Sequence, residues 1–244
     1  MTLSIVISVS HDHAALERLK ASIESQSRSV KLFIEQNDKF PGRALAYSKA
    51  DTDFVLFLDA DCELPDSNFC VRLVNFFEKN QDVDVVGGLY LDPQNANTIC
   101  RSYNKICNLW VEIGAGHNLL GGVFCIRKGS LEEWPIADHF WGGEDTMLFR
   151  ELSIRGMNLQ MQPEFSVIHH DLGSFKKLVR RAWIHGRVRK QRQLFTPRRH
   201  RGLWDARKKL ISSFSLPEIG VALGHYFLVG VAGLLSKPKI SPNK

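Results

Sequence analysis

The chain has 244 residues, 44% of them hydrophobic, which is enough for the core of one large domain or of one domain with an appendage. Five scattered cysteines without a CxxC pair indicate reduced thiols in the cytosol or at a cytosol-facing surface, and the N-terminus lacks the basic start of a signal peptide. The net charge of +6 is uneven, because residues 1–175 carry 15 Lys/Arg against 24 Asp/Glu and residues 176–209 carry 14 against one.

The first part of the chain alternates strand and helix patterns. Apolar runs predict strands, and apolar positions three or four residues apart predict helices. Strands are expected at 3–9, 30–34, 54–61 and 83–90, and helices at 14–25, 43–49 and 68–79. The short connections predict a parallel sheet with helices on both faces.

The second part is predicted to be richer in helices. Strands are expected at 121–126 and 165–168, and helices at 96–112, 144–155 (ending at Gly156), and 174–194. A short helix is expected from Ser130. The last apolar stretch, Ile219–Leu235, has 17 residues, slightly fewer than the ~20 of a spanning helix.

The strand 54–61 ends in two acids, Asp59 and Asp61. If the strand continues to its last residue, both carboxylates point to one spot at the C-terminal edge of the sheet, where open α/β sheets bind ligands. Oxygen ligands of this kind suit Mg²⁺ or Mn²⁺ bridged to substrate phosphates. A strand that ends in an acidic turn is the alternative.

Further polar residues follow other expected strands or begin a helix. Glu144 and Asp145, after Trp141-Gly142-Gly143, could supply a general base or only cap their helix. His170 or His169 could complete a metal site or be an ordinary histidine. Two further candidates share the edge of Asp59: Glu35 could contact a base or ribose and Arg43 a phosphate, or both could be solvated loop charges.

Together, residues 4–9, 41–49, 54–61 and 142–145 resemble family 2 glycosyltransferases with the GT-A fold. The resemblance implies a Rossmann-like, mixed, mainly parallel α/β sheet flanked by helices. It implies that the donor contacts are Ser8, Glu35, Arg43, Asp59 and Asp61. Asp59 matches the donor-contacting acid of the Asp-x-Asp motif, Asp61 the ligand of the metal on the diphosphate, and Glu35 the contact to the base.

Residues 121–171 also resemble the galactosyltransferase and polypeptide N-acetylgalactosaminyltransferase families, in which a Gly-Gly strand, a Trp-Gly-Gly-Glu-Asp segment and a metal-binding His occur in this order. The resemblance implies Asp145 as the base that deprotonates the acceptor. It implies acceptor contacts from Trp141, Gly143 and Glu144. It also implies His170, with His169 as the alternate, as a ligand of Mn²⁺ or Mg²⁺ together with Asp61.

Two departures from family 2 matter. Strand one ends in Ser8-Val9-Ser10-His11. The acid after the second strand, Glu35, is not part of an Asp pair, which leaves open which nucleotide base the donor carries. The Gln-x-x-Arg-Trp motif of processive synthases is absent, with Arg180-Arg181-Ala182-Trp183 as a loose echo, so transfer of single sugars is expected.

The expected activity is inverting, metal-dependent transfer of a sugar from a nucleotide sugar, a UDP-sugar in the first instance, to a carbohydrate or lipid-linked acceptor in cell-surface polysaccharide or glycolipid synthesis. The catalytic domain is expected at 1–172, with a donor half at 1–91 and an acceptor half at 92–172, followed by a helical extension at 173–244. A sugar-nucleotide nucleotidyltransferase and a non-catalytic nucleotide-sugar-binding scaffold are the alternatives.

The basic extension needs an anionic partner. A charge run is usually a solvated face, but 14 cations in 34 residues favour anionic lipid or a lipid-diphosphate acceptor, contacted by residues 176–235. No nucleic-acid module is recognised. For 219–235, an interfacial or re-entrant segment fits better than a span, and a helix packed on the domain is the alternative. The expected location is the cytoplasm, peripheral on the inner face of the cell membrane.

Overall fold

The computed structural model describes most of the chain. The described residues are 1–8, 13–35, 40–113, 119–132, 134, 144–170, 173–195 and 212–235. Trp141 and Gly143, for which acceptor contacts are predicted, lie outside these ranges.

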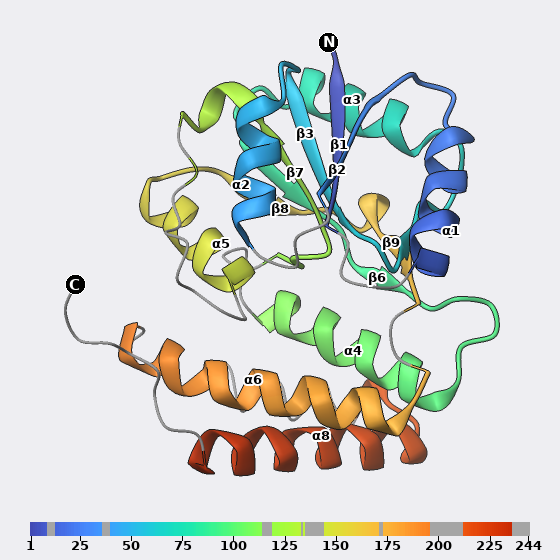
Figure 1. The fold of residues 1–244 in the computed structure, drawn as a ribbon, viewed down its shortest axis with the longest axis vertical. Helices are drawn as coiled ribbons and strands as arrows, with labels where there is room; N and C mark the ends of the chain where they lie inside the picture. Colours follow the sequence, from blue (N-terminus) through green and yellow to red (C-terminus); the bar gives the residue numbers. More distant parts are fainter. Residues whose placement is uncertain are drawn as a thin grey trace.

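Within the described residues, a six-stranded sheet in the order β2-β1-β3-β7-β5-β8 forms the centre of the molecule (Figure 1). Its pairings β1–β2, β1–β3 and β5–β8 are parallel, and β7 runs antiparallel between β3 and β5. The mainly parallel α/β sheet predicted from the sequence is therefore confirmed. The strands are β1 (Leu3–Ser8), β2 (Lys31–Glu35), β3 (Phe54–Asp59), β5 (Val85–Gly87), β7 (Val123–Arg127) and β8 (Leu159–Met161).

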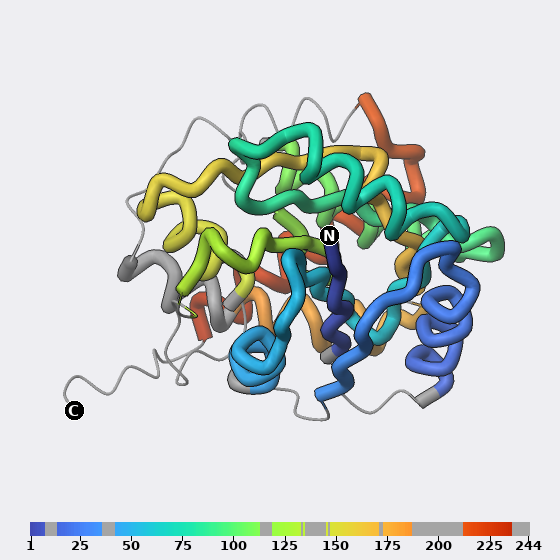
Figure 2. Tube along the Cα trace, turned by 90° about the horizontal axis from the view of Figure 1, so that it is seen from above, coloured from blue at the N-terminus to red at the C-terminus, as the bar shows by residue number. Residues whose placement is uncertain are grey.

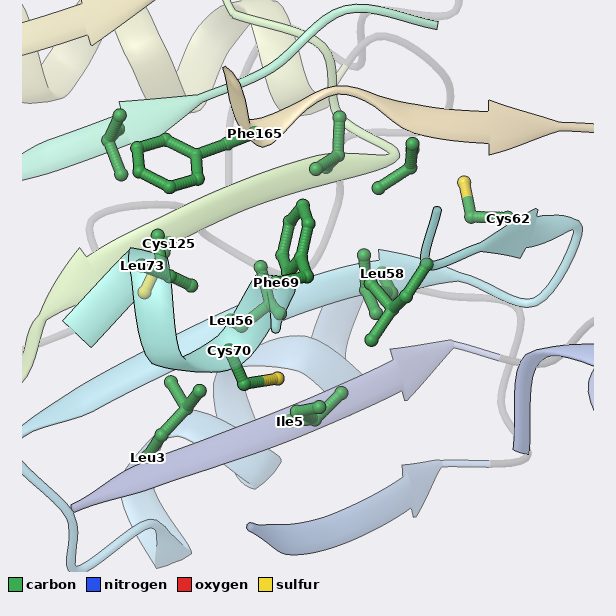
Figure 3. Packing of buried hydrophobic residues seen from close by; sticks show 14 of the residues in the cluster. Leu3, Ile5, Leu56, Leu58, Cys62, Phe69, Cys70, Leu73, Cys125 and Phe165 are labelled. Carbon is green, nitrogen blue, oxygen red and sulfur yellow. The ribbon is translucent and has the colours of Figure 1, made fainter. Parts of the chain in front are cut away.

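Helices cover both faces of this sheet because β3 is apolar on both of its alternating sides. On one face, α1 (His13–Glu24) and α3 (Phe69–Lys79) pack over Leu56 and Leu58 (Figure 3). On the other face, α2 (Phe40–Lys49) and α5 (Glu144–Ile154) pack over Val55 and Phe57. Seen from above, α2 and α3 lie on opposite sides of β1 and β3 (Figure 2).

A second, three-stranded sheet in the order β4-β9-β6 lies beside the C-terminal ends of the main strands. It consists of β4 (Cys62–Glu63), β6 (Tyr90–Leu91) and β9 (Val167–His169). The single strand expected at 83–90 is thus divided, because the chain changes sheets at Gly88. A Cβ at Gly88 would lie 1.9 Å from the carbonyl oxygen of Phe165, so only glycine fits this crossing.

Three helices form a separate layer below the sheets (Figure 1). They are α4 (Thr98–Ile113), α6 (Phe175–Phe195) and α8 (Leu216–Leu235). The helix α4 lies next to the small sheet, α8 is outermost, and α6 and α8 pack along each other. The sequence predicted α4 and α6 within two residues at each end, and α8 begins three residues earlier than expected.

Two other elements differ from their predictions. β3 ends at Asp59, and Ala60 and Asp61 form a turn into β4, so the expectation that the strand continues to Asp61 is wrong. The sequence does not predict β8, because it has only three residues and one of them, Gln160, is polar; its parallel pairing with β5 defines it. Two 3-10 helices, Lys128–Ser130 and Pro163–Phe165, complete the described elements.

Candidate active site

The register of the main sheet places three predicted donor contacts side by side. Ser8 pairs with Glu35 on one side and with Asp59 on the other, each as the last residue of its strand. Lys49 of α2 lies 3.6 Å from Glu35, as an ion pair between its Nζ and the Glu35 Oε1. The C-terminal edge of β2, β1 and β3 therefore forms the floor of the candidate site.

Asp59 forms an ion pair with the guanidinium of Arg43, whose side chain is nearly buried and packs over the Phe124 ring at 5.8 Å. Although 37% of the Asp59 side chain is exposed, the surrounding protein desolvates the carboxylate and raises its pKa. The positive charges of Arg43 and of Arg181 in α6 oppose this rise. Arg43 thus holds the carboxylate in place, and the basic helix extends its field to the same spot.

Asp61 faces His169 across the junction of β4 and β9. The Nε2 atom of His169 lies 3.7 Å from the Asp61 Oδ1, and the imidazole stacks on Tyr90 with 3.9 Å between ring centroids. His169 is almost fully buried. The backbone N–H of His170 donates to the Asp61 carbonyl at 2.9 Å, which fixes the turn that carries Asp61 to this strand.

Asn104 of α4 sets the orientation of the His169 ring. Its Oδ1 lies 2.7 Å from the His169 Nδ1, while its amide nitrogen donates to Asp92 Oδ1 at 3.0 Å and to the His169 carbonyl at 3.3 Å. Because acceptors take both amide hydrogens, Oδ1 must accept from Nδ1–H. The ring then presents the Nε2 lone pair to Asp61, as a metal-binding histidine does.

His170 has different surroundings. Its Nε2 lies 2.8 Å from Glu63 Oε2, and both side chains line a depression of about 530 Å³ that also includes Ile168. Ile168 and Glu63 face each other across β9 and β4, and neighbouring residues of a strand point to opposite faces. The structure therefore brings His169, and not His170, to Asp61.

Asp145 reaches the site through the glycine pair Gly121-Gly122. A Cβ at Gly121 would lie 2.8 Å from Asp145 Oδ2, and one at Gly122 would lie 3.0 Å from Asp59 Oδ2. The carboxylates of α5 and β3 thus lie beside two consecutive residues that lack side chains. Glu144, predicted to contact the acceptor, is the first residue of α5.

These residues fit a divalent cation only in part. Within the described part of the chain, no three His, Cys, Asp or Glu side chains are grouped to ligate one ion. Asp61 and His169 supply one oxygen and one nitrogen ligand. Mg²⁺ and Mn²⁺ sites often use one or two protein carboxylates and take the remaining ligands from phosphates and water, so donor phosphates and water would have to complete a site at this pair.

Residues 10–148 match the family described as glycosyl transferase family 2, a match that covers more than half of the chain. The chain belongs to glycosyl transferase family 2. No curated protein matches it.

Solved structures of this kind share the fold. A mannosyltransferase from Pyrobaculum calidifontis, in complex with GDP-Man and Mn²⁺, is 13% identical with a TM-score of 0.62, over 96% of this chain and 87% of that one. Glucosyl-3-phosphoglycerate synthase from Mycobacterium tuberculosis, in complex with Mn²⁺, UDP and glucosyl-3-phosphoglycerate, is 14% identical with a TM-score of 0.51, over 76% and 77%.

Sequence reasoning missed the residues of α4 and the small sheet that support the site. Tyr90 stacks on His169, and Asn108 clamps the Tyr90 backbone with two hydrogen bonds of 2.8 Å. Asn104 and Asn108 lie four residues apart, about one helical turn, so both amides are on the same side of α4. That spacing was the available signal, but nothing in the sequence identifies what the two amides face.

Proposed function

We propose that this glycosyltransferase transfers one sugar at a time from a nucleoside diphosphate sugar to an acceptor hydroxyl with inversion, and that it requires Mn²⁺ or Mg²⁺. A UDP-sugar is the first donor to test. The observation that carries the proposal is the meeting of Asp59, Asp145 and the Asp61–His169 pair at one edge of the sheet. The proposed catalytic domain is residues 1–172, with the donor half at 1–91 and the acceptor half at 92–172, and residues 173–244 form the extension.

Each residue has a proposed role. Asp59, held by Arg43, contacts the ribose or the sugar of the donor, and Glu35 and Ser8 contact the nucleoside beside it. Asp61 and His169 would hold the cation, which when bound offsets the negative charge of the leaving diphosphate. His170, the ligand implied by the resemblance, becomes the alternate because its Nε2 contacts Glu63.

Asp145 is the proposed general base. Its carboxylate takes the proton of the acceptor hydroxyl, the oxygen forms a bond to the anomeric carbon, and the bond from that carbon to the diphosphate breaks on the opposite side. Because residues 121 and 122 are glycines, Asp145, the Tyr90 hydroxyl and Asp59 can approach this part of the backbone closely, which brings both carboxylates to the same place. Trp141, Gly143 and Glu144 are the proposed acceptor contacts on the segment before α5.

A donor-hydrolysis screen tests the activity. Sugar nucleotides are incubated with the protein and Mn²⁺, and release of a nucleoside diphosphate is the expected result. A nucleotidyltransferase would instead consume added pyrophosphate and form a nucleoside triphosphate and a sugar 1-phosphate, and no product with or without pyrophosphate would indicate a scaffold.

Two variants test the roles. Asp145→Asn should lower transfer by ~10²–10⁴-fold with donor binding retained, because only the proton acceptor is removed. The matched control on the same helix, Glu151→Gln, changes a carboxylate paired with Arg155 and should leave transfer unchanged. Asp61→Ala should abolish the Mn²⁺-dependent part of donor binding in calorimetry, whereas Asp51→Ala should not; equal binding by both variants contradicts the metal assignment.

The proposed partner of residues 176–235 is an anionic membrane surface, which would place the enzyme in the cytoplasm on the inner face of the cell membrane. The 14 Lys/Arg residues between 176 and 209 support this proposal. A carbohydrate or lipid-linked acceptor in polysaccharide or glycolipid synthesis is consistent with such a location.

A further inference from the structure

The helix α8 has one side that packs on the protein and one that does not. Its buried residues, Glu218, Ala222, His225, Val229 and Ala232, recur three or four positions apart. The opposite side exposes large apolar side chains. The exposed fractions are 57% for Leu223, 70% for Phe227, 83% for Leu234 and 85% for Leu216. Glu218 is the one charged residue of this helix, so the exposed side carries no charge.

The buried side is fixed firmly to the neighbouring helices. A Cβ at Gly186 of α6 would lie 2.5 Å from the Val229 carbonyl and 2.6 Å from the Ala232 Cβ, so the two helices cross in close contact. At its other end, Glu218 accepts from Lys105 Nζ of α4 at 2.8 Å. These contacts fix the apolar side of α8 toward the outside of the molecule.

By length and composition α8 could cross a membrane. It packs along α6, however, and α6 contains eight Lys/Arg residues between Lys176 and Arg192. Moving α8 into the hydrocarbon would bring these cations with it, which is unfavourable for each charge. A spanning α8 would otherwise have to leave α6 and expose Glu218 and His225 to lipid.

An aromatic pair lies between α4 and α8, and exposed basic residues lie on α6, which packs along α8. Trp110 of α4 is 47% exposed, and its ring lies 6.3 Å from that of Tyr226. Aromatic rings are enriched at the headgroup level of bilayers. Lys176, Lys177 and Arg180 are exposed on α6, the helix that packs along α8, which suits anionic headgroups rather than a neutral protein partner.

We infer that α8 is an in-plane docking helix, which inserts its outward face into the interface of an anionic phospholipid bilayer while α6 stays at the headgroups. This inference rests on the membrane partner proposed above and deepens it, because it names the contact face and excludes a span. It also implies a lipid-linked acceptor: α4 packs on α8 with one side and holds His169 and Tyr90 with the other, so docking brings the site to the membrane.

Vesicle flotation of the full chain tests the inference. Binding is measured to vesicles of phosphatidylcholine with phosphatidylglycerol and to vesicles of phosphatidylcholine alone. The double variant Leu223→Glu/Phe227→Glu should bind the anionic vesicles at least tenfold more weakly. The matched control, Leu91→Glu/Ile154→Glu, places the same charges at apolar residues that are 43% and 67% exposed elsewhere, and should bind as the unchanged protein does.

Three outcomes would overturn the inference. They are equal vesicle binding by the α8 variant and its control, resistance of the membrane-bound chain to alkaline carbonate extraction, as for a spanning helix, and a lipid-free dimer that the α8 variant alone abolishes. Donor hydrolysis of the α8 variant in solution separates this inference from the proposed function. Donor hydrolysis by this variant should equal that of the unchanged protein if the transferase assignment holds. If no variant hydrolyses the donor, the transferase assignment is contradicted, and vesicle binding still tests the role of α8.

Discussion

The strand β3 and the helix α8 are both almost purely apolar, yet the fold treats them in opposite ways. From Phe54 to Leu58, β3 is at most 1% exposed, because helices cover both faces of its sheet. In α8, Phe227 and Leu234 are mostly exposed, because the helix is the outermost element and has neighbours on one side (Figure 1). An apolar run therefore indicates that a segment is to be buried, whereas the packing shows whether the protein itself or a partner buries it.

The largest expected difference between the two elements is in stability. Leu56→Ala in β3 should lower the free energy of unfolding by about 2–5 kcal/mol, because a cavity forms in a close-packed core. Phe227→Ala in α8 should change it by less than about 0.5 kcal/mol in lipid-free buffer, since the ring is exposed. Urea unfolding measures both, and a large effect of Phe227→Ala would mean that α8 is covered in solution.

The attachment of α8 predicts a pH dependence. Burial lowers the pKa of His225 to about 4, and its Nδ1 has no hydrogen-bond partner among the described residues. The unfolded state, with a pKa near 6.5, binds the proton more tightly, so stability is complete above about pH 6.5 and falls as the pH drops toward 4. The loss is about 3 kcal/mol. In His225→Phe the free energy of unfolding should change less with pH between 6.5 and 4. An unchanged pH dependence would exclude His225 as its source.

The helix α4, which lies between the small sheet and α8, predicts a smaller effect, on metal binding. Asn104→Ala removes the acceptor that orients His169 and should weaken Mn²⁺ binding in the presence of UDP by about 10–100-fold. Electron paramagnetic resonance of unbound Mn²⁺ measures this independently of turnover. Asn95→Ala, at an exposed position in the same region, is the control, and equal Mn²⁺ affinity of the two variants would remove Asn104 from its positioning role.

Two glycine-to-alanine substitutions, one in α6 and one in α8, should change the stability of this helical layer in opposite directions. Gly186→Ala should destabilise the packing of α6 on α8 by about 1–3 kcal/mol, because its Cβ meets backbone atoms of α8. Gly224→Ala, on α8 with open space around it, should stabilise the helix by up to about 1 kcal/mol. Hydrogen exchange of the α8 amides reports both changes, and the same sign for the two variants would contradict the close crossing at Gly186.

Much of the site could be predicted because motif and sheet position agree. Ser8, Glu35 and Asp59 each end a strand, and parallel strands bring their C-terminal ends to one edge. The position of Asp61 depends instead on a turn after β3, which the apolar pattern of the strand does not indicate. The choice between His169 and His170 was likewise open, because the direction of each ring depends on the pairing of β9 with β4.

The sequence by itself determined the α/β order of the elements, the buried central strand and the acids at its end, because hydrophobic periodicity and strand ends are local properties. The tertiary structure alone decided which histidine faces Asp61, which amide orients it, and which side of α8 remains exposed. Those outcomes depend on contacts between residues far apart in the chain, such as Asn104 with His169 and Gly186 with Val229, and no local pattern encodes them.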